Sequence, residues 1–246
     1  MIYFVTGGSR GIGAAIVLQA VREGHDVAFT YLTAEEQALQ VVQQARELRP
    51  EAVCRHYRMD VRDPQEVERV GNQVLDDFDT VHVIVNNAAI NRDNLAVYMS
   101  DEEWRDVLAT NLDGPFYVCR HFLTTLLGNR FGRIINISSI TADGASGQIN
   151  YATAKAGLRG LTRSLAKEYG PKGITANVVM PGFFDTEMTQ QTMSEESKFF
   201  WFKYCPARRI GKLDEIGAVV TFLGSKASSF INGAEIPVTG GLEHAP

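Results

Sequence analysis

The stretch TGGSRGIG at residues 6–13 follows a short apolar run and opens a segment of helical period, Ile12–Glu23. Its glycines let the backbone turn sharply and leave room for a pyrophosphate to approach the first N–H groups of the helix. The spacing GxxxGxG differs from the general GxGxxG fingerprint of dinucleotide-binding loops. The order of strand, glycine-rich turn and helix predicts a nucleotide-binding loop, with a tight structural turn as the alternative.

Beyond this loop, short apolar runs alternate with longer segments of helical period. Strands are predicted at Ile2–Thr6, Val27–Tyr31, Val53–Met59, Val81–Asn86, Arg133–Ser138, Thr175–Val179 and Glu235–Val238. Helices are predicted at Ile12–Glu23, Ala34–Arg49, Pro64–Asp77, Asp101–Leu127, Asn150–Tyr169 and Leu213–Leu223. Several strand runs are almost continuously apolar, as in parallel strands that are covered on both faces. The sequence predicts a single α/β domain over residues 1–246, a doubly wound, Rossmann-type, seven-stranded parallel sheet with helices on both faces.

Composition excludes several other classes of protein. The 246 residues carry 24 lysines and arginines against 29 aspartates and glutamates, a formal net charge of -5, which does not favour nucleic-acid or membrane-surface binding. Three cysteines and five histidines show neither CxxC nor HExxH spacing, so neither a disulfide framework nor a metal site is expected. No signal peptide and no run of about 18 apolar residues is found, and a cytoplasmic location is expected.

Residues 182–211 fall outside the alternation of strands and helices. A long irregular segment in a compact domain is usually functional, so a substrate lid is predicted here, with a surface excursion as the alternative. The lid contains KFFWFKY at residues 198–204. An aromatic wall would favour an unsaturated or aryl acyl chain, whereas rings that face the core or a subunit interface are the alternative.

The charge near the second predicted strand bears on the choice of cofactor. An NAD enzyme usually has an acid at the end of that strand, but the residues here are Thr30-Tyr31-Leu32-Thr33. Arg10, in the glycine-rich loop, offers a planar guanidinium suited to a 2′-phosphate, with a solvated surface arginine as the alternative. Asp60, after the third strand, is expected beside the adenine. The sequence predicts NADP(H) over NAD(H).

Candidate catalytic residues follow the fifth strand. Tyr151 and Lys155 stand four residues apart and therefore share one face of a predicted helix. Such a pair alone is usually ordinary packing beside a solvated amine. Here the strand before it ends in Ser138-Ser139, at the carboxyl edge where doubly wound sheets bind ligands.

Taken in order, these motifs resemble the short-chain dehydrogenase/reductase family over essentially the whole chain. The resemblance rests on the glycine-rich loop, Asn86-Asn87-Ala88-Ala89, Asn111, Ser139, Tyr151-xxx-Lys155 and Pro181-Gly182. Segments 91–95, 101–104, 147–151 and 181–183 are most similar to 3-oxoacyl-acyl-carrier-protein reductases. This resemblance implies NADPH-dependent reduction of a 3-oxoacyl thioester in fatty-acid or polyketide-type biosynthesis. The alternatives are an NADP-dependent reductase of acetoacetyl-CoA, a sugar or a steroid, and a catalytically silent nucleotide-binding partner subunit.

The resemblance also implies a role for each catalytic residue. Tyr151 gives a proton to the ketone oxygen, and Lys155, with the oxidised nicotinamide, lowers the pKa of that phenol and binds the nicotinamide ribose. Ser139 donates to the substrate carbonyl, and Asn111 holds a water that links Lys155 to solvent. The family's usual spacing reaches Ser138 instead, but the Ile-Ser-Ser motif favours Ser139, because a one-residue shift of a buried strand would turn every side chain over.

The resemblance implies cofactor-binding residues in the loop, after the strands and in the segment that meets the nicotinamide carboxamide. Asn86 and Ala88 are expected beneath the adenosine ribose, with packing at the strand end as the alternative for Asn86. The full set is Gly7, Ser9, Arg10, Gly11, Ile12, Gly13, Asp60, Val61, Asn86, Ala88, Tyr151, Lys155, Pro181, Gly182, Phe183 and Thr186.

Expected partners also follow from charge and resemblance. Arg130, Arg133 and Lys172 form a predicted basic patch for an acidic acyl carrier protein, with scattered solvated cations as the alternative. The resemblance implies a homotetramer built from the helices Asp101–Leu127 and Asn150–Tyr169 and the last strand, or a hetero-oligomer with a related subunit.

Overall fold

The computed structural model describes residues 1–186, 201 and 203–242. Its strands are β1 (Ile2–Val5), β2 (Asp26–Tyr31), β3 (Cys54–Arg58), β4 (Val83–Asn86), β5 (Gly132–Ile137), β6 (Ile174–Pro181) and β7 (Glu235–Val238). They form one seven-stranded sheet in the order β3-β2-β1-β4-β5-β6-β7, with every neighbouring pair parallel. The predicted doubly wound sheet is confirmed.

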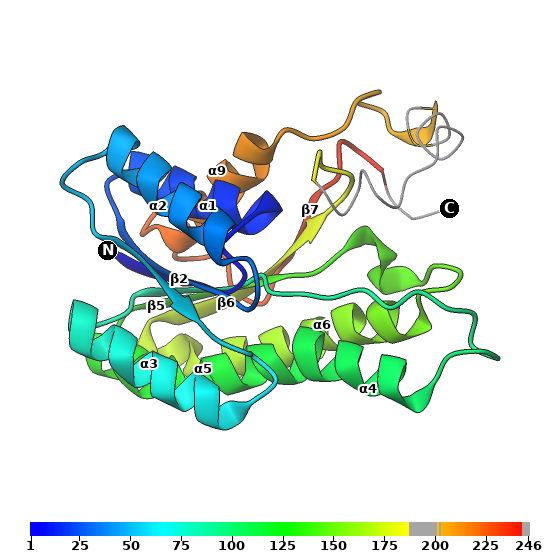
Figure 1. Cartoon of the computed structure of the whole chain (residues 1–246), viewed down its shortest axis with the longest axis horizontal. Helices are drawn as coiled ribbons and strands as arrows, with labels where there is room; N and C mark the ends of the chain where they lie inside the picture. The colour runs from blue at the N-terminus through cyan, green and yellow to red at the C-terminus, as the bar shows by residue number, and fades with distance from the viewer. Residues whose placement is uncertain (187–200, 202, 243–246) are drawn as a thin grey trace.

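Helices cover both faces of this sheet (Figure 1). One face carries α1 (Gly11–Arg22), α2 (Glu35–Leu48) and α9 (Leu213–Gly224). The other carries α3 (Pro64–Phe78), α4 (Asp101–Leu108), the π turn η1 (Ala109–Asp113), α5 (Gly114–Asn129) and α6 (Ile149–Tyr169). Two short 3-10 turns, η2 (Ile140–Asp143) and η3 (Gly170–Lys172), stand before and after α6.

Local sequence explains where several helices begin. Asp63 caps α3, since its carboxylate accepts hydrogen bonds from the backbone N–H groups of Gln65 and Glu66, and Pro64 follows it in the first turn. Ser100 and Glu103 form a reciprocal capping box at the start of α4. These caps satisfy N–H groups that a helix leaves without internal partners.

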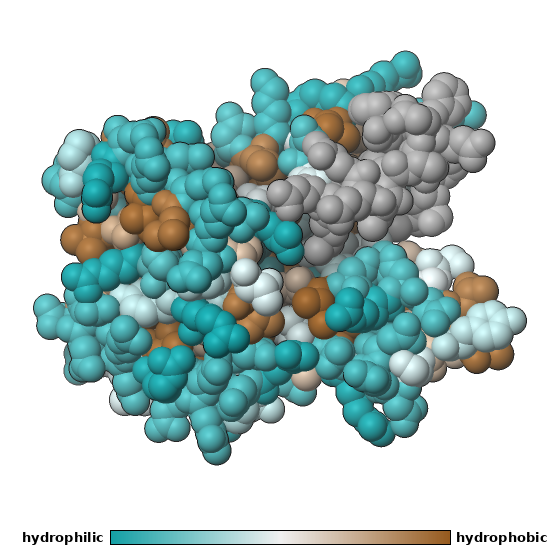
Figure 2. Space-filling view, in the orientation of Figure 1, coloured by the Kyte–Doolittle hydropathy of each residue, from teal (hydrophilic) through white to brown (hydrophobic). Residues whose placement is uncertain are grey.

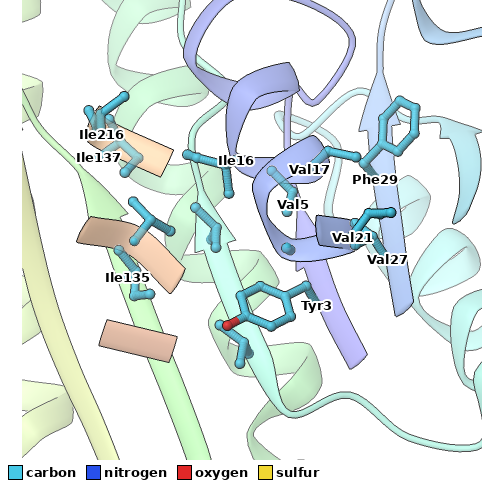
Figure 3. Close-up of a cluster of buried hydrophobic side chains, with 14 of the residues drawn as sticks. Tyr3, Val5, Ile16, Val17, Val21, Val27, Phe29, Ile135, Ile137 and Ile216 are labelled. Atoms are coloured by element: carbon cyan, nitrogen blue, oxygen red, sulfur yellow. The ribbon is translucent and has the colours of Figure 1, made fainter. Parts of the chain in front are cut away.

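The alternation of side chains along the strands divides the core in two. Tyr3 and Val5 of β1 pack with Ile16 and Phe29 in the cluster under α1, α2 and α9 (Figure 3). Phe4, between them, packs toward α3, α5 and α6. Strands β4, β5 and β6 are buried along their whole lengths. The visible surface is mostly polar, with separate apolar patches (Figure 2).

The helix predicted over Asp101–Leu127 is interrupted, which corrects the prediction of one continuous helix. The backbone N–H of Gly114 donates to the carbonyl of Ala109, five residues earlier, where an α-helix would reach back four. Pro115 follows, and it lacks the N–H that an uninterrupted helix would direct to the carbonyl of Asn111. The π turn therefore separates α4 from α5 at a predicted site residue.

Arg133 does not lie on the predicted basic patch, because the structure buries it at the start of β5. The side chain is 3% exposed, and its guanidinium donates to the carbonyls of Gly132, Gly173 and Ser225 at 2.9, 3.3 and 3.0 Å. It also lies over the ring of Phe131. Arg133 thus supplies charged donors to carbonyl groups at the amino edge of the sheet and at the end of α9.

We therefore expect Arg133→Gln to lower the free energy of unfolding by about 2 kcal/mol, because three carbonyl groups lose hydrogen bonds from a buried charged donor. Urea unfolding measures this change. The control is Arg130→Gln, an exposed residue at the end of α5, which should change stability by less than about 0.5 kcal/mol. Equal stability of the two variants would contradict the structural role of Arg133.

Candidate active site

The glycine-rich loop between β1 and α1 has a shape that fits a phosphate group. Gly7 and Gly11 adopt left-handed φ angles of 65° and 54°. A Cβ on Gly13 would collide with the carbonyl of Gly7 and the side chain of Asn87. Arg10 is the N-cap residue of α1, and its side chain makes no capping hydrogen bond to the helix. The first N–H groups of α1 and the glycines beside them therefore fit a pyrophosphate.

Asn87 is a site residue that sequence reasoning missed. Its side-chain amide donates to the carbonyls of Thr6 and Gly7 at 3.1 and 2.9 Å. In return, Thr6 Oγ1 accepts hydrogen bonds from the backbone N–H groups of Asn87 and Ala88 at 3.0 and 3.1 Å. These bonds join the carboxyl ends of β1 and β4, where the strand order reverses and doubly wound sheets bind ligands.

The segment after β6 reaches the same edge. Gly182 donates to the carbonyl of Val238, and a Cβ on Gly182 would press against the backbone of Thr239. The methyl group of Thr186 lies 3.5 Å from the position that a Cβ on Gly11 would occupy. The structure thus brings the segment that begins at Pro181 against the glycine-rich loop.

Four other expected cofactor residues lie at the start of α1 or directly after β3. Ser9 is buried, and Ile12 is half-buried in the first turn of α1. Val61 belongs to the core on the α3 and α5 side. Asp60 binds Arg62 through both carboxylate oxygens, and these hydrogen bonds hold the pKa of the Asp60 carboxyl below its usual value. Asp60 therefore stays ionised beside a compensating cation.

The side chain of Asn86 points into the sheet, as the alternative of strand-end packing predicts, and the place of this residue beneath an adenosine ribose stays a prediction. It is 3% exposed, and its amide donates to Asn136 Oδ1 at 2.7 Å and to Cys119 Sγ at 3.3 Å. Asn136 in turn donates to Thr162 Oγ1 of α6 at 2.8 Å. The side chain of Asn86 is thus used in a buried polar network between β4, β5 and α6.

Ser139, Tyr151 and Lys155 come together at the carboxyl end of β5. Ser139 caps η2, and its hydroxyl makes hydrogen bonds with Thr141 and lies beside the hydroxyl of Tyr151. Ser138 is buried and donates instead to the backbone carbonyl of Lys155 at 3.1 Å. Of the two serines, the structure places Ser139 against the tyrosine.

Lys155 is an amine inside the fold. It is 2% exposed, and its Nζ donates to the carbonyl of Ile137 at 2.7 Å and lies 5.5 Å from the centre of the Tyr151 ring. Burial lowers the pKa of Lys155 to about 7. Close to neutral pH, this amine is therefore divided between its charged and neutral forms.

The environment of Tyr151 raises the pKa of its phenol to about 12. Burial is the largest cause, the charge of Asp93 adds to it, and the hydrogen bond with Ser139 opposes it. Lys155 is not among these causes. The expected lowering of this pKa by Lys155 together with the oxidised nicotinamide stays a prediction.

The side chain of Asn111 is bound to the backbone of Ile90, and the expectation that this residue holds a water stays a prediction. The side chain is fully buried; its oxygen accepts from the N–H of Ile90, and its amide donates to the carbonyl of Ile90, both at 2.9 Å. Asn111 thus fixes the chain that follows β4 to the π turn. Pro115 was the available signal that this helix is irregular, but it does not show where the amide points.

Half of the predicted lid at residues 182–211, namely 187–200 and 202, lies outside the described residues, and Phe199, Phe200 and Phe202 belong to that half. Trp201 is 9% exposed and packs on Phe183, Ile140 and Leu242, with 3.8 Å between the centres of the Trp201 and Phe183 rings. Tyr204 is half-exposed. For Trp201, the alternative of a ring that faces the core is the one observed.

Comparisons with known proteins agree with this arrangement. A family model described as enoyl-(acyl carrier protein) reductase matches residues 7–243. The chain belongs to the short-chain dehydrogenase/reductase family. This short-chain dehydrogenase/reductase is an oxidoreductase that uses a nicotinamide cofactor.

Individual relatives of this short-chain dehydrogenase/reductase match it along nearly its whole length. It is 40% identical to the 3-oxoacyl-[acyl-carrier-protein] reductase FabG of Staphylococcus aureus (strain Mu50), over 97% of this chain and 96% of that protein. The protein of the same name from Salmonella typhimurium (strain LT2) is 40% identical over 98% and 96%. The crystal structure of levodione reductase superposes with a TM-score of 0.93 at 29% identity, over 98% of this chain and 97% of that one.

In this short-chain dehydrogenase/reductase, none of the described helices is both long and apolar enough to cross a membrane. The described residues also contain no group of three or more His, Cys, Asp or Glu side chains that could hold a metal ion.

The lowered pKa of Lys155 makes stability depend on pH. Between about 7 and the ordinary value of 10.5, the unfolded chain binds more protons than the folded chain, so stability rises with pH in this window. Urea unfolding of the wild type and Lys155→Met at about pH 7 and about pH 9 should show a steeper rise for the wild type. Parallel pH dependence of the two proteins would mean that Lys155 titrates normally.

Proposed function

We propose that this chain reduces a 3-oxoacyl thioester to the 3-hydroxyacyl thioester with NADPH, on an acyl chain carried by an acyl carrier protein. The pathway class would be fatty-acid or polyketide-type biosynthesis. The observation that carries the proposal is the contact of the Ser139 and Tyr151 hydroxyls beside buried Lys155, at the sheet edge that holds the glycine-rich loop. The names of the relatives at 40% identity support the substrate class.

The chain's own residues would supply the proton that the ketone oxygen takes up. The bound cofactor would supply the hydride. Tyr151 keeps its phenol protonated at neutral pH, because its pKa lies at about 12, and gives this proton to the ketone oxygen. Ser139 donates a hydrogen bond to the same oxygen as negative charge develops there. Lys155, with a pKa of about 7, exchanges protons easily near neutrality and restores the proton of Tyr151.

The preference for NADPH over NADH is supported by cations near the end of β2. Arg10 is exposed at the start of α1, and Arg58 Nε donates to the carbonyl of Leu32 at 3.2 Å, directly after β2. Arg58 is a second candidate partner for a 2′-phosphate that sequence reasoning missed. Glu35 in the first turn of α2 is hydrogen-bonded to the hydroxyl of Tyr31.

A second candidate function is the reduction of a ketone that is not a thioester. The close superposition with levodione reductase favours it, since the two folds agree along nearly the whole chain. A catalytically silent subunit is disfavoured, because a protein that only binds a nucleotide has no use for the serine, tyrosine and lysine that meet at this site.

Turnover of acetoacetyl-acyl carrier protein, followed by NADPH absorbance, tests the proposal. We expect faster turnover with NADPH than with NADH. Tyr151→Phe should reduce kcat at least about a hundredfold, because the proton donor is lost, and Ser139→Ala should reduce it far more than Ser138→Ala. Unchanged NADPH consumption by folded Tyr151→Phe would refute the proposed role of the tyrosine. Turnover of small ketones without turnover of acetoacetyl-acyl carrier protein would favour the second candidate function, the reduction of a ketone that is not a thioester.

Arg130 and Lys172 remain as the proposed contact for the carrier protein. Both are exposed, and Gly173 brings their segments together, since a Cβ on it would press against the carbonyl of Arg130. They lie at the amino end of β5 and β6, at the other end of the strands from Ser139. A carrier that docks there would therefore have to reach across the sheet or serve another copy of the chain.

Charge reversal should distinguish this docking from scattered surface charge. We expect Arg130→Glu combined with Lys172→Glu to raise KM for acetoacetyl-acyl carrier protein about tenfold and to leave KM for acetoacetyl-CoA unchanged. At high salt, the difference in KM between this variant and the wild type should shrink, because screening weakens the attraction that the wild type retains. An equal rise of KM for both substrates would exclude a carrier patch.

A further inference from the structure

Three charged residues form a network behind the candidate catalytic residues. The guanidinium of Arg159 donates from one nitrogen to Asp143 Oδ1 at 2.6 Å and from Nε to Glu235 Oε1 at 2.7 Å. The side chains of Arg159 and Glu235 are each 23% exposed, and that of Asp143 is 51% exposed. A planar guanidinium that binds two carboxylates in a half-buried place is held more firmly than an isolated surface pair.

Each of the three residues stands on an element that carries or borders the site. Arg159 follows Lys155 by four residues on α6, and Tyr151 by eight, so all three share one face of this helix. Asp143 is the last residue of η2, the turn that Ser139 caps. Glu235 begins β7 and pairs with Val178 of β6. Arg159 thus ties the helix of the tyrosine to the turn of the serine and to the sheet.

The turn after Ser139 has little other polar support. Apart from the bond between Asp143 and Arg159, the hydrogen bonds of residues 140–144 within the described part of the chain are local, such as Ala142 N–H to the Ser139 carbonyl and Gly144 N–H to the Thr141 carbonyl. Ile140 adds apolar contacts with Trp201 and Leu242. Among these described residues, the bond from Asp143 to Arg159 is the ion pair that holds the turn to α6.

We propose that Arg159 is a positioning residue, whose ion pair with Asp143 keeps the Ser139 hydroxyl in place beside the Tyr151 hydroxyl. This inference rests on the proposed function, because it gives Arg159 importance only if Ser139 and Tyr151 act on substrate. A displacement of about 1 Å between groups that act together can cost a large part of the rate. Arg159 itself touches neither reacting group.

The ion pair between Arg159 and Asp143 persists over the working pH range. The hydrogen bond from Arg159 holds the pKa of the Asp143 carboxyl below its usual value, and the two carboxylates raise the pKa of Arg159. The ion pair therefore weakens only when Asp143 is protonated in acid. Loss of activity in the Arg159 variants should consequently not change between neutral and mildly alkaline pH.

A double-mutant cycle tests the proposal in the full chain. We expect Arg159→Gln to lower kcat about tenfold, with the dissociation constant of NADPH, measured by fluorescence titration, unchanged. In a Ser139→Ala background the same substitution should lower kcat by less than about twofold, because the group that it positions is already gone. If Arg159→Gln lowered kcat only by disturbing the fold, it would lower kcat by the same factor in the Ser139→Ala background as in the wild type.

Matched variants separate the two arms of the network. The control is Arg163→Gln, one turn further along α6, which is exposed and forms no ion pair among the described residues; it should leave kcat unchanged. Asp143→Asn should reproduce the effect of Arg159→Gln, while Glu235→Gln should lower stability more than kcat. Arg159→Lys, which keeps the charge, should restore part of the rate, and it also serves if Arg159→Gln does not fold.

The outcomes distinguish this inference from the proposed function. If Ser139→Ala lowers kcat while Arg159→Gln does not, or if the two losses multiply, the positioning role of Arg159 is overturned and the proposed function stands. If Ser139→Ala leaves kcat unchanged, the serine has no role in the reaction, and the role of Arg159 falls with it.

Discussion

The buried hydrogen bond from Lys155 Nζ to the carbonyl of Ile137 is the contact on which the arrangement of the site depends. It joins α6 to the end of β5, and the hydroxyl of Ser138 returns a bond to the carbonyl of Lys155. This double link fixes the helix at the height where Tyr151 meets Ser139. It also removes Lys155 from water, which is why the amine loses its proton near neutrality. One contact thus sets both the geometry and the proton affinity of the site.

The cofactor side of the site depends on a second link, between β1 and β4. These strands are neighbours in the sheet but distant in sequence, so their carboxyl ends open a crevice at the reversal of strand order. Thr6 and Asn87 close the base of that crevice with hydrogen bonds in both directions. The glycine-rich loop is therefore held by strands on both sides, although its own residues favour flexibility.

The fold was predictable because apolar runs, glycines and helix caps all point to the same parallel sheet. The tyrosine and the lysine could be proposed from their helical spacing together with the family resemblance, and Ser139 could be proposed over Ser138 from the Ile-Ser-Ser motif at the end of a buried strand. The directions in which buried asparagine side chains point could not be predicted from the sequence. Asn86 and Asn87 are adjacent and chemically identical, and only the packed sheet shows which of them turns toward the loop. Likewise, nothing in the composition indicates that Arg133 is buried, because its partners are backbone carbonyls from three separate segments.

The π turn before α5 contains one residue more than an α-helical path would need. Each residue advances a helix by about 100°, so this extra residue rotates everything after it by more than a quarter of a turn. Because of that rotation, Val118, Phe122 and Leu126 of α5 face the sheet. A chain shortened by a single residue here would present a different side of α5 to the core, so the length of this segment is as strictly constrained as any side chain in it.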